Sequence, residues 1–180
     1  MKLGLVVEGH GEVEAVPVLM RRLLSAHGVT RLDIPSPLRL PKGKLVKQAE
    51  FVRAIDLMAS KTAPDGALLV ILDADTDCPA EVGPRLCAWA RESRRDRPVS
   101  VVVAKYEFES WFLAAAVSLR GHRGLPADLE PPSDAEAIRD AKGWLGARMP
   151  NGYSETLDQP ALAAIFDFEA AARSPSFKKL

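Results

Sequence analysis

The chain has 180 residues, a length typical of one domain, and 47% of them are hydrophobic, which is enough for a sizeable core. Lys plus Arg and Asp plus Glu each number 24, so the formal net charge is zero. This balance argues against a strongly basic protein that coats nucleic acid, although it allows a local basic patch. Cys78 and Cys87 lack the CxxC spacing of a zinc site and imply no disulfide framework.

The N-terminal stretch MKLGLVV predicts a buried strand over residues 3–7. Glu8 ends the apolar run too early for the core of a signal peptide. No segment reaches the roughly 18 apolar residues that a membrane helix needs. We therefore expect a cytoplasmic protein that makes no contact with a membrane.

Two helices and an irregular strand are predicted next. The first helix covers 12–27, and Pro17 would fit it better if regular helix began close to that proline. The segment 31–40 contains two prolines, so any strand there should be irregular or lie at an edge. A basic turn at 42–44 leads into an amphipathic helix over 45–60.

The middle of the chain contains two further apolar runs. ALLVIL at 67–72 and PVSVVVA at 98–104 predict buried strands, and helices are predicted over 80–93 and 109–118. The strands are continuous apolar runs that alternate with helices. This pattern is typical of an α/β fold in which a mainly parallel sheet is covered by helices on both faces.

The remaining residues predict a helical extension of a single domain. A Gly- and Pro-rich loop covers 119–133, and helices are predicted over 134–148 and 158–173. We expect an α/β core over 1–118 and an extension over 119–180 that packs against it.

Acidic side chains follow three of the predicted strands at their carboxyl ends, where functional groups gather in open α/β sheets. They are Glu8, Glu12 and Glu14 after the first strand, Asp73, Asp75 and Asp77 after the third, and Glu107 and Glu109 after the fourth. If these strands are parallel neighbours, the carboxylates crowd one rim of the sheet. Crowded carboxylates either hold protons or bind a hard divalent cation, and the lack of a His or Cys cluster favours Mg²⁺ or Mn²⁺ over zinc.

Each acidic cluster taken alone also fits ordinary helix capping. Glu12 could simply oppose the dipole at a helix start, and DADTD could be a turn that caps the next helix. An EF-hand loop does not fit, because Cys78 stands where Gly is needed and Pro84 where Glu is needed. A Walker A loop does not fit either, since EGHGEVEA lacks Gly-Lys-Ser/Thr.

The spacing of these acids resembles a known family. The TOPRIM domain of topoisomerases, primases and nucleases is resembled by three features that follow strands, namely Glu8-Gly9, Glu12 and the Asp73-x-Asp75 pair. Within that group, the stretch VVEGHGE looks closest to the overcoming-lysogenization-defect (OLD) nucleases. The stretches EGHGE, LDADTDCP, EFESWFLA and SPSFKKL are similar to the TOPRIM-like family called domain of unknown function 4276, over nearly the whole chain.

The resemblance implies a compact TOPRIM-like (Rossmann-like) fold and a bound Mg²⁺ or Mn²⁺ ion. It implies catalytic roles for Glu8, which would act as a general acid or base, and for Glu12, Asp73 and Asp75. The metal ligands it implies are Glu8, Glu12, Asp73 and Asp75, to which Asp77 is added as either a ligand or a cap. Glu109 matches a motif of the narrower family, and we count it as a candidate catalytic residue.

The function that follows is a Mg²⁺-dependent phosphoryl-transfer enzyme, most simply a nuclease, with Lys44, Lys105 and Lys142 as candidate contacts to nucleic-acid phosphates. Two alternatives remain open. TOPRIM nucleases often work beside an ATPase, frequently in phage defence, so the chain could instead be a non-catalytic, metal-binding partner of an ATPase. A phosphoacceptor receiver domain ranks lower, because its acid pair would directly follow the first strand, where this chain has Glu8-Gly9.

Overall fold

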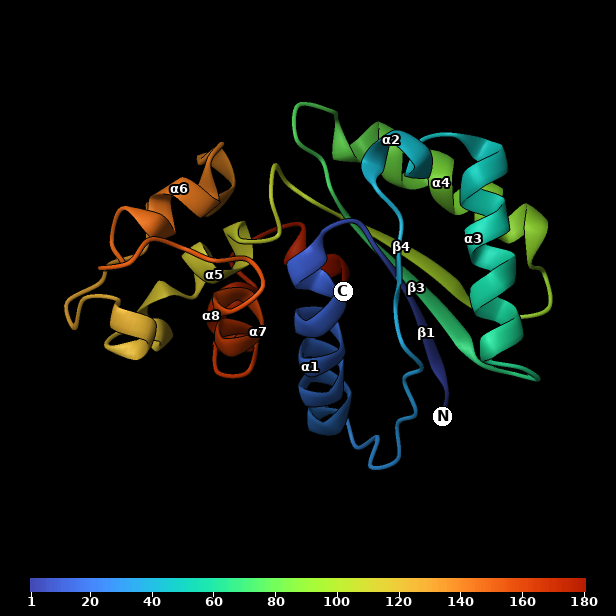
Figure 1. The fold of residues 1–180 in the computed structure, drawn as a ribbon, viewed down its shortest axis with the longest axis horizontal. Coiled ribbons are helices and arrows are strands. Elements are labelled where there is room, and N and C mark those ends of the chain that lie inside the picture. The colour runs from blue at the N-terminus through green and yellow to red at the C-terminus, as the bar shows by residue number, and fades with distance from the viewer.

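The computed structural model describes all residues from 1 to 180 and contains one four-stranded sheet. All strands are parallel, in the order β2-β1-β3-β4 (Figure 1). The strands are β1 Leu3–Val7, β2 Leu38–Arg39, β3 Ala67–Asp73 and β4 Val99–Ala104. The predicted α/β fold with a parallel sheet flanked by helices is confirmed.

The strands that end in acids are direct neighbours. Val7 of β1 pairs with Ile71 of β3, and Asp73 of β3 pairs with Ala104 of β4. Because all the strands run in the same direction, their carboxyl ends lie along one rim of the sheet. The segments that follow β1, β3 and β4 therefore start side by side.

Helices cover both faces of the sheet, as continuous apolar strands require. One face carries α3 Gln48–Lys61 and α4 Pro79–Ser93, which bury their apolar sides against it together with the short α2 Lys42–Leu45 (Figure 1). The other face carries α1 His10–Ala26 and the C-terminal extension. The sheet thus has a separate hydrophobic core on each side.

The local structure differs from the sequence prediction in the first 60 residues. Regular helix α1 begins at His10, not near Pro17, which lies buried inside the helix. The ring of Pro17 removes one helical hydrogen bond, but the buried side chains around it hold the helix in place. β2 keeps only two residues of the proline-containing segment, and the basic turn at 42–44 is part of α2.

The predicted long helices of the extension are wrong in length, because the extension is a series of short helices. These are α6 Ala141–Gly146, α7 Asp158–Ala163, α8 Phe168–Ala171, and the 3₁₀ turns His122–Gly124, Ala135–Ala137 and Phe177–Lys179. The helix predicted over 109–118 is likewise divided, into α5 Ser110–Ala114 and the 3₁₀ turn Ala116–Leu119. Side-chain caps explain two of the breaks. Asp140 Oδ1 accepts the Gly143 N–H at 2.7 Å and Asp167 Oδ1 accepts the Ala170 N–H at 2.7 Å, so new helices start inside the predicted ones.

The extension shares its core with the α/β part. One hydrophobic cluster of 30 buried residues includes residues of β1, α1 and α5 as well as Leu162 and Phe177. Arg22 of α1 fastens the two parts by donating to the carbonyl oxygens of Ala163 and Phe166, at 2.7 and 3.0 Å. The extension is therefore packed against the core, as expected.

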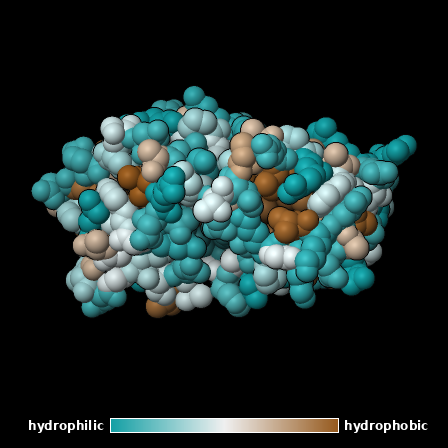
Figure 2. All heavy atoms as spheres, turned by 90° about the horizontal axis from the view of Figure 1, so that it is seen from above, coloured by the Kyte–Doolittle hydropathy of each residue, from teal (hydrophilic) through white to brown (hydrophobic).

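The outer surface is mainly hydrophilic. Figure 2 shows its largest brown apolar patch in the half of the molecule that contains the sheet, with smaller brown areas scattered among polar side chains elsewhere on that face. None of the helices combines the length and the apolar character that crossing a lipid bilayer requires.

Candidate acidic site at the carboxyl ends of the strands

Glu8 connects the ends of β1 and β3. It directly follows β1, and its Oε2 accepts the backbone N–H of Asp73 at 3.2 Å. Burial raises the pKa of Glu8, and the negative charge of Asp75 adds to the shift, while the hydrogen bond from Asp73 opposes it. Residues 65 positions apart in the chain thus meet at the rim of the sheet.

Asp73 is the last residue of β3, and its carboxylate is buried. Its Oδ1 accepts the Phe108 N–H at 2.7 Å, so the loop after β4 holds it in place. Its Oδ2 lies 3.9 Å from Lys142 Nζ. Burial, followed by the charges of Glu12 and Glu109, raises the pKa of Asp73 well above its usual value.

Glu12 lies in the first turn of α1 and is also buried. Its Oε2 accepts the backbone N–H groups of Glu8 and Gly9, at 2.9 and 3.1 Å. The side chain therefore fixes the turn that carries Glu8 and satisfies an N–H at the helix start. Burial raises the pKa of Glu12 to about 7 against the opposing effect of these hydrogen bonds.

Glu109 comes from the loop between β4 and α5 and is completely buried. Its Oε1 accepts the Tyr153 hydroxyl at 2.9 Å and Gln159 Nε2 at 3.0 Å, and its Oε2 has no hydrogen-bond partner. Burial raises the pKa of Glu109 to about 7, and burial together with the charge of Glu109 raises that of Tyr153.

Lys142 is the cation of this group. Its Nζ lies 2.8 Å from Glu155 Oε1 and 4.0 Å from Glu107 Oε1, and its backbone N–H donates to Glu107 Oε2 at 3.0 Å. Burial works to lower the pKa of Lys142, but the carboxylates of Glu109, Glu155 and Asp73 outweigh it, so the pKa is raised. The side chain stays charged and offsets part of the negative charge of the cluster.

Asp75 and Asp77 pair with a different cation, Lys42, although the charge of Asp75 still acts on Glu8. β3 ends at Asp73, and Asp75 has a φ of 48°, so the segment does not stay extended as alignment of the Asp73 and Asp75 side chains would require. Lys42 Nζ lies 2.8 Å from Asp75 Oδ2 and 3.2 Å from Asp77 Oδ2. The two aspartates and Lys42 form a separate, half-exposed ion-pair cluster beside the buried acids.

The other predicted basic residues lie outside the acid cluster. Lys44 is exposed in α2, and Lys105 Nζ lies 4.3 Å from the centre of the Tyr106 ring. Neither forms an ion pair with an acidic side chain.

Tyr153, Glu155 and Gln159 complete the cluster, and the sequence prediction missed them. All three come from the extension, within or just before α7. The PNGYSET segment that contains Tyr153 and Glu155 has the composition of a connecting loop, and Gln159 falls in an ordinary amphipathic pattern. No local signal could have identified them, because their role depends on where the extension packs.

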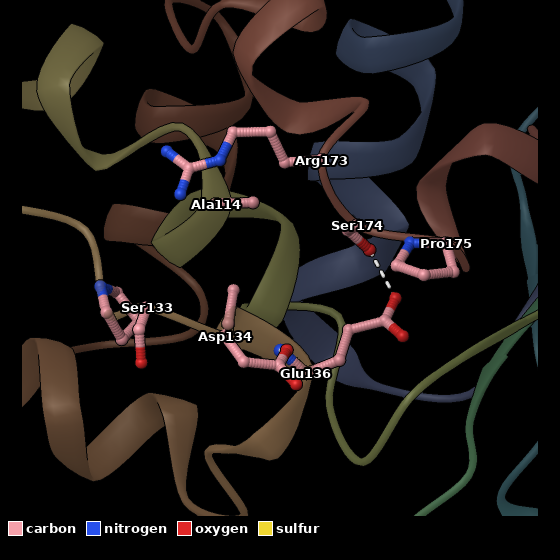
Figure 3. A pocket seen from close by; sticks show the side chains of 9 residues that line it. Ala114, Ser133, Asp134, Glu136, Arg173, Ser174 and Pro175 are labelled. Atoms are coloured by element: carbon pink, nitrogen blue, oxygen red, sulfur yellow. Dashed lines mark hydrogen bonds between the residues drawn. The ribbon is translucent and has the colours of Figure 1, made fainter.

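A cavity of about 350 Å³ lies elsewhere, between the segments 132–136 and 173–175 of the extension, beside the end of α5 (Figure 3). Glu136 and Ser174 line it and share a hydrogen bond, and the guanidinium of Arg173 points away from them. None of the predicted site residues lines this cavity. The acid cluster therefore lies apart from this cavity, and its distinguishing feature is its buried carboxyl groups.

No group of three or more His, Cys, Asp or Glu side chains in the structure is arranged to hold a metal ion. Glu8 and Asp73 do meet, but Glu12 and Glu109 each use one oxygen for internal hydrogen bonds. Any metal held here would have few direct protein ligands.

Comparison with known sequences assigns the chain to a family. It matches the family described as domain of unknown function (DUF4276) over residues 7–180, and it therefore belongs to that family. No curated protein and no solved structure matches the chain.

Proposed function

We propose that the protein is a Mg²⁺- or Mn²⁺-dependent phosphoryl-transfer enzyme, a TOPRIM-type nuclease that cleaves nucleic acid. The observation that carries the proposal is the contact between Glu8 and Asp73 at the carboxyl ends of adjacent parallel strands. At the ends of β1 and β3, the carboxyl groups of Glu8 and Asp73 both have raised pKa values, and the positive charge of a divalent cation would stabilise their ionised forms.

The donor set fits a cation that keeps most of its water. Mg²⁺ needs only one or two direct carboxylates, because water and substrate phosphate supply its other oxygen ligands. Glu8 and Asp73 would provide those two, and Asp75 and Asp77 could add ligands only by leaving Lys42. When bound, such an ion stabilises the charge that develops on a transferring phosphate and activates a water molecule.

The protein's own residues would do the rest. Glu8, half-buried with a raised pKa, can accept a proton from an attacking water or return one to a leaving oxygen. Lys142 remains positively charged beside Asp73 and can offset charge on a bound phosphate. Lys44 and Lys105 can contact the flanking nucleic-acid backbone.

The test is incubation of the purified protein with plasmid, single-stranded DNA and RNA in the presence of Mg²⁺ or Mn²⁺. We expect cleavage that Glu8→Gln reduces by about 100-fold or more, since a positioned acid or base typically contributes about that much. Asp73→Asn should also reduce cleavage strongly, because it removes a negatively charged oxygen ligand of the metal ion. Asp65→Asn, at an exposed position without ion pairs, is the matched control and should cleave normally. Equal cleavage by wild type and Asp73→Asn would count decisively against the proposal.

A second candidate function is a non-catalytic, metal-binding module that works with an ATPase, as in phage defence. The outer edge of β4 favours it, because no further strand pairs with that edge, and a groove of about 360 Å³ runs between α4 and β4. An open strand edge can accept a partner. Co-purification with the product of a neighbouring ATPase gene, without cleavage by either protein or the complex, would favour this candidate over the nuclease.

A further inference from the structure

Glu109 and Gln159 each contain one buried oxygen without a partner. Both side chains are almost inaccessible, at 0% and 2% exposure. Gln159 Nε2 donates to Glu109 Oε1 at 3.0 Å. The other oxygen of the Glu109 carboxyl group, Oε2, has no hydrogen-bond partner, and neither does the amide oxygen of Gln159, Oε1. If Glu109 were ionised, both atoms would be acceptors, and each buried acceptor without a donor costs about 1–3 kcal/mol.

We propose that Glu109 is a neutral carboxylic acid whose Oε2–H donates to Gln159 Oε1, which closes an acid–amide pair with two hydrogen bonds. One proton then supplies the donor that both oxygens lack. The remaining contact agrees with this arrangement, because the Tyr153 hydroxyl donates to Oε1, the atom that is the carbonyl oxygen of a neutral acid.

Burial favours the proton on Glu109 and raises its pKa to about 7. Glu107 from the same loop, Glu12 from α1 and Asp73 from β3 face Glu109, and Lys142 of α6 is the one cation opposed to them. Lys142 and the hydrogen bond from Tyr153 oppose the rise in the pKa of Glu109, and burial, with a smaller contribution from the charge of Glu107, outweighs them. A buried water could donate to both oxygens instead, but it would leave another negative charge among these carboxylates.

The pair makes Gln159 a positioning residue. It ties α7 of the extension to the loop between β4 and α5, and the Phe108 N–H of that loop donates to Asp73 Oδ1. Gln159 thereby helps to orient Asp73 through Glu109 and the Phe108 backbone. Only this last step rests on the proposed function, because the acid–amide pair stands without it.

The first test exchanges acid and amide. Glu109→Gln keeps a donor and an acceptor on each side of the pair, so the variant should fold. At about pH 6, where Glu109 of the wild type is protonated, the two proteins should have the same urea midpoint. Gln159→Glu should lower the midpoint at neutral pH, because two facing acids need a second proton. The double variant, Glu109→Gln with Gln159→Glu, restores one acid and one amide and should recover most of the loss. Failure of Glu109→Gln to fold, or of the double variant to recover stability, would overturn the pair.

The second test observes the proton directly. The wild type in metal-free buffer near about pH 6 should show an infrared carbonyl band of a protonated carboxyl group that Glu109→Gln lacks. If the two spectra have the same protonated-carboxyl bands, Glu109 is ionised and the proposal is wrong.

Calorimetry with Mn²⁺ separates the two proposals. Loss of Mn²⁺ binding only in Glu109→Gln would make Glu109 a ligand and overturn the pair, whereas a wild type that binds no Mn²⁺ would contradict the proposed metal site alone.

Discussion

At the scale of single residues, the site is defined by carboxyl groups that differ in what they contact. Glu8 joins two strands, Glu12 holds the turn that carries Glu8, and Glu109 is enclosed by the extension. All three have raised pKa values, and burial is the main cause for each. In the absence of metal, these groups should therefore make stability depend on pH near neutrality.

Glu12→Gln should remove one part of this pH dependence. The folded-state pKa of Glu12 is about 7, above its ordinary value of 4.5, so protonation favours the folded state. The stabilisation is complete below about pH 4.5 and is lost as the pH rises through about 7. The glutamine keeps an oxygen for the Glu8 and Gly9 N–H groups but has no charge to bury. Between these pH values, the free energy of unfolding should therefore fall less for Glu12→Gln than for the wild type. The difference should be a few kcal/mol, because each unit of pKa shift corresponds to about 1.4 kcal/mol.

Urea unfolding in buffer with a chelator would measure the effect across that pH range. Glu14→Gln, at an exposed position in the same helix, is the control and should follow the wild-type curve. Parallel curves for wild type and Glu12→Gln would mean that Glu12 titrates alike in the folded and unfolded states.

At the scale of elements, the contact between α1 and α7 depends on a glycine. A Cβ atom at Gly11 would lie 2.4 Å from both Gln159 Oε1 and the Glu155 carbonyl oxygen. The backbone carbonyl cannot move without shifting the start of α7. Gly11 therefore allows the first turn of α1 to approach the extension closely, where the acid cluster forms.

Gly11→Ala should destabilise the protein by about 1–3 kcal/mol, because the added methyl group overpacks this contact. Gly43→Ala is the matched control. A Cβ there meets nothing within 4 Å, so the change should be neutral or slightly stabilising through helix propensity. Thermal and urea unfolding would distinguish the two, and equal stability of both variants would show that α1 and α7 do not pack this closely.

The sequence was sufficient to predict β1, β3 and β4 closely, but not the length of β2 or the short helices of the extension. Apolar runs such as ALLVIL define β3 to within one residue, and parallel neighbours bring Glu8 and Asp73 to one rim. The extension was predicted less well, because caps such as Asp140 break an otherwise helical pattern. The predicted position of Asp75 depended on an extended segment, whereas its backbone is left-handed and its carboxylate pairs with Lys42.

At the scale of the whole molecule, the C-terminal tail closes the core that the two parts share. Phe177, three residues from the end of the chain, is only 6% exposed. Its ring centre lies 5.4 Å from that of Trp111 and 5.7 Å from that of Phe166, in edge-to-face arrangements. Ser176 beside it accepts the Trp111 indole N–H at 2.8 Å. The tail therefore supports the helix that follows Glu109 and, through it, the loop that holds Asp73.

Phe177→Ala should consequently cost about 3–5 kcal/mol, the range for removing a buried aromatic side chain. Because the lost contacts reach Trp111, near-ultraviolet circular dichroism and tryptophan fluorescence should change along with the unfolding midpoint. Leu157→Ala removes a side chain that is 66% exposed and should leave all three measurements unchanged. If Phe177→Ala behaves like this control, the tail only rests on the surface and the loop that carries Glu109 is held without it. A loss of stability in the expected range, together with changed tryptophan signals, would show that Phe177 is part of the core that supports Trp111 and α5.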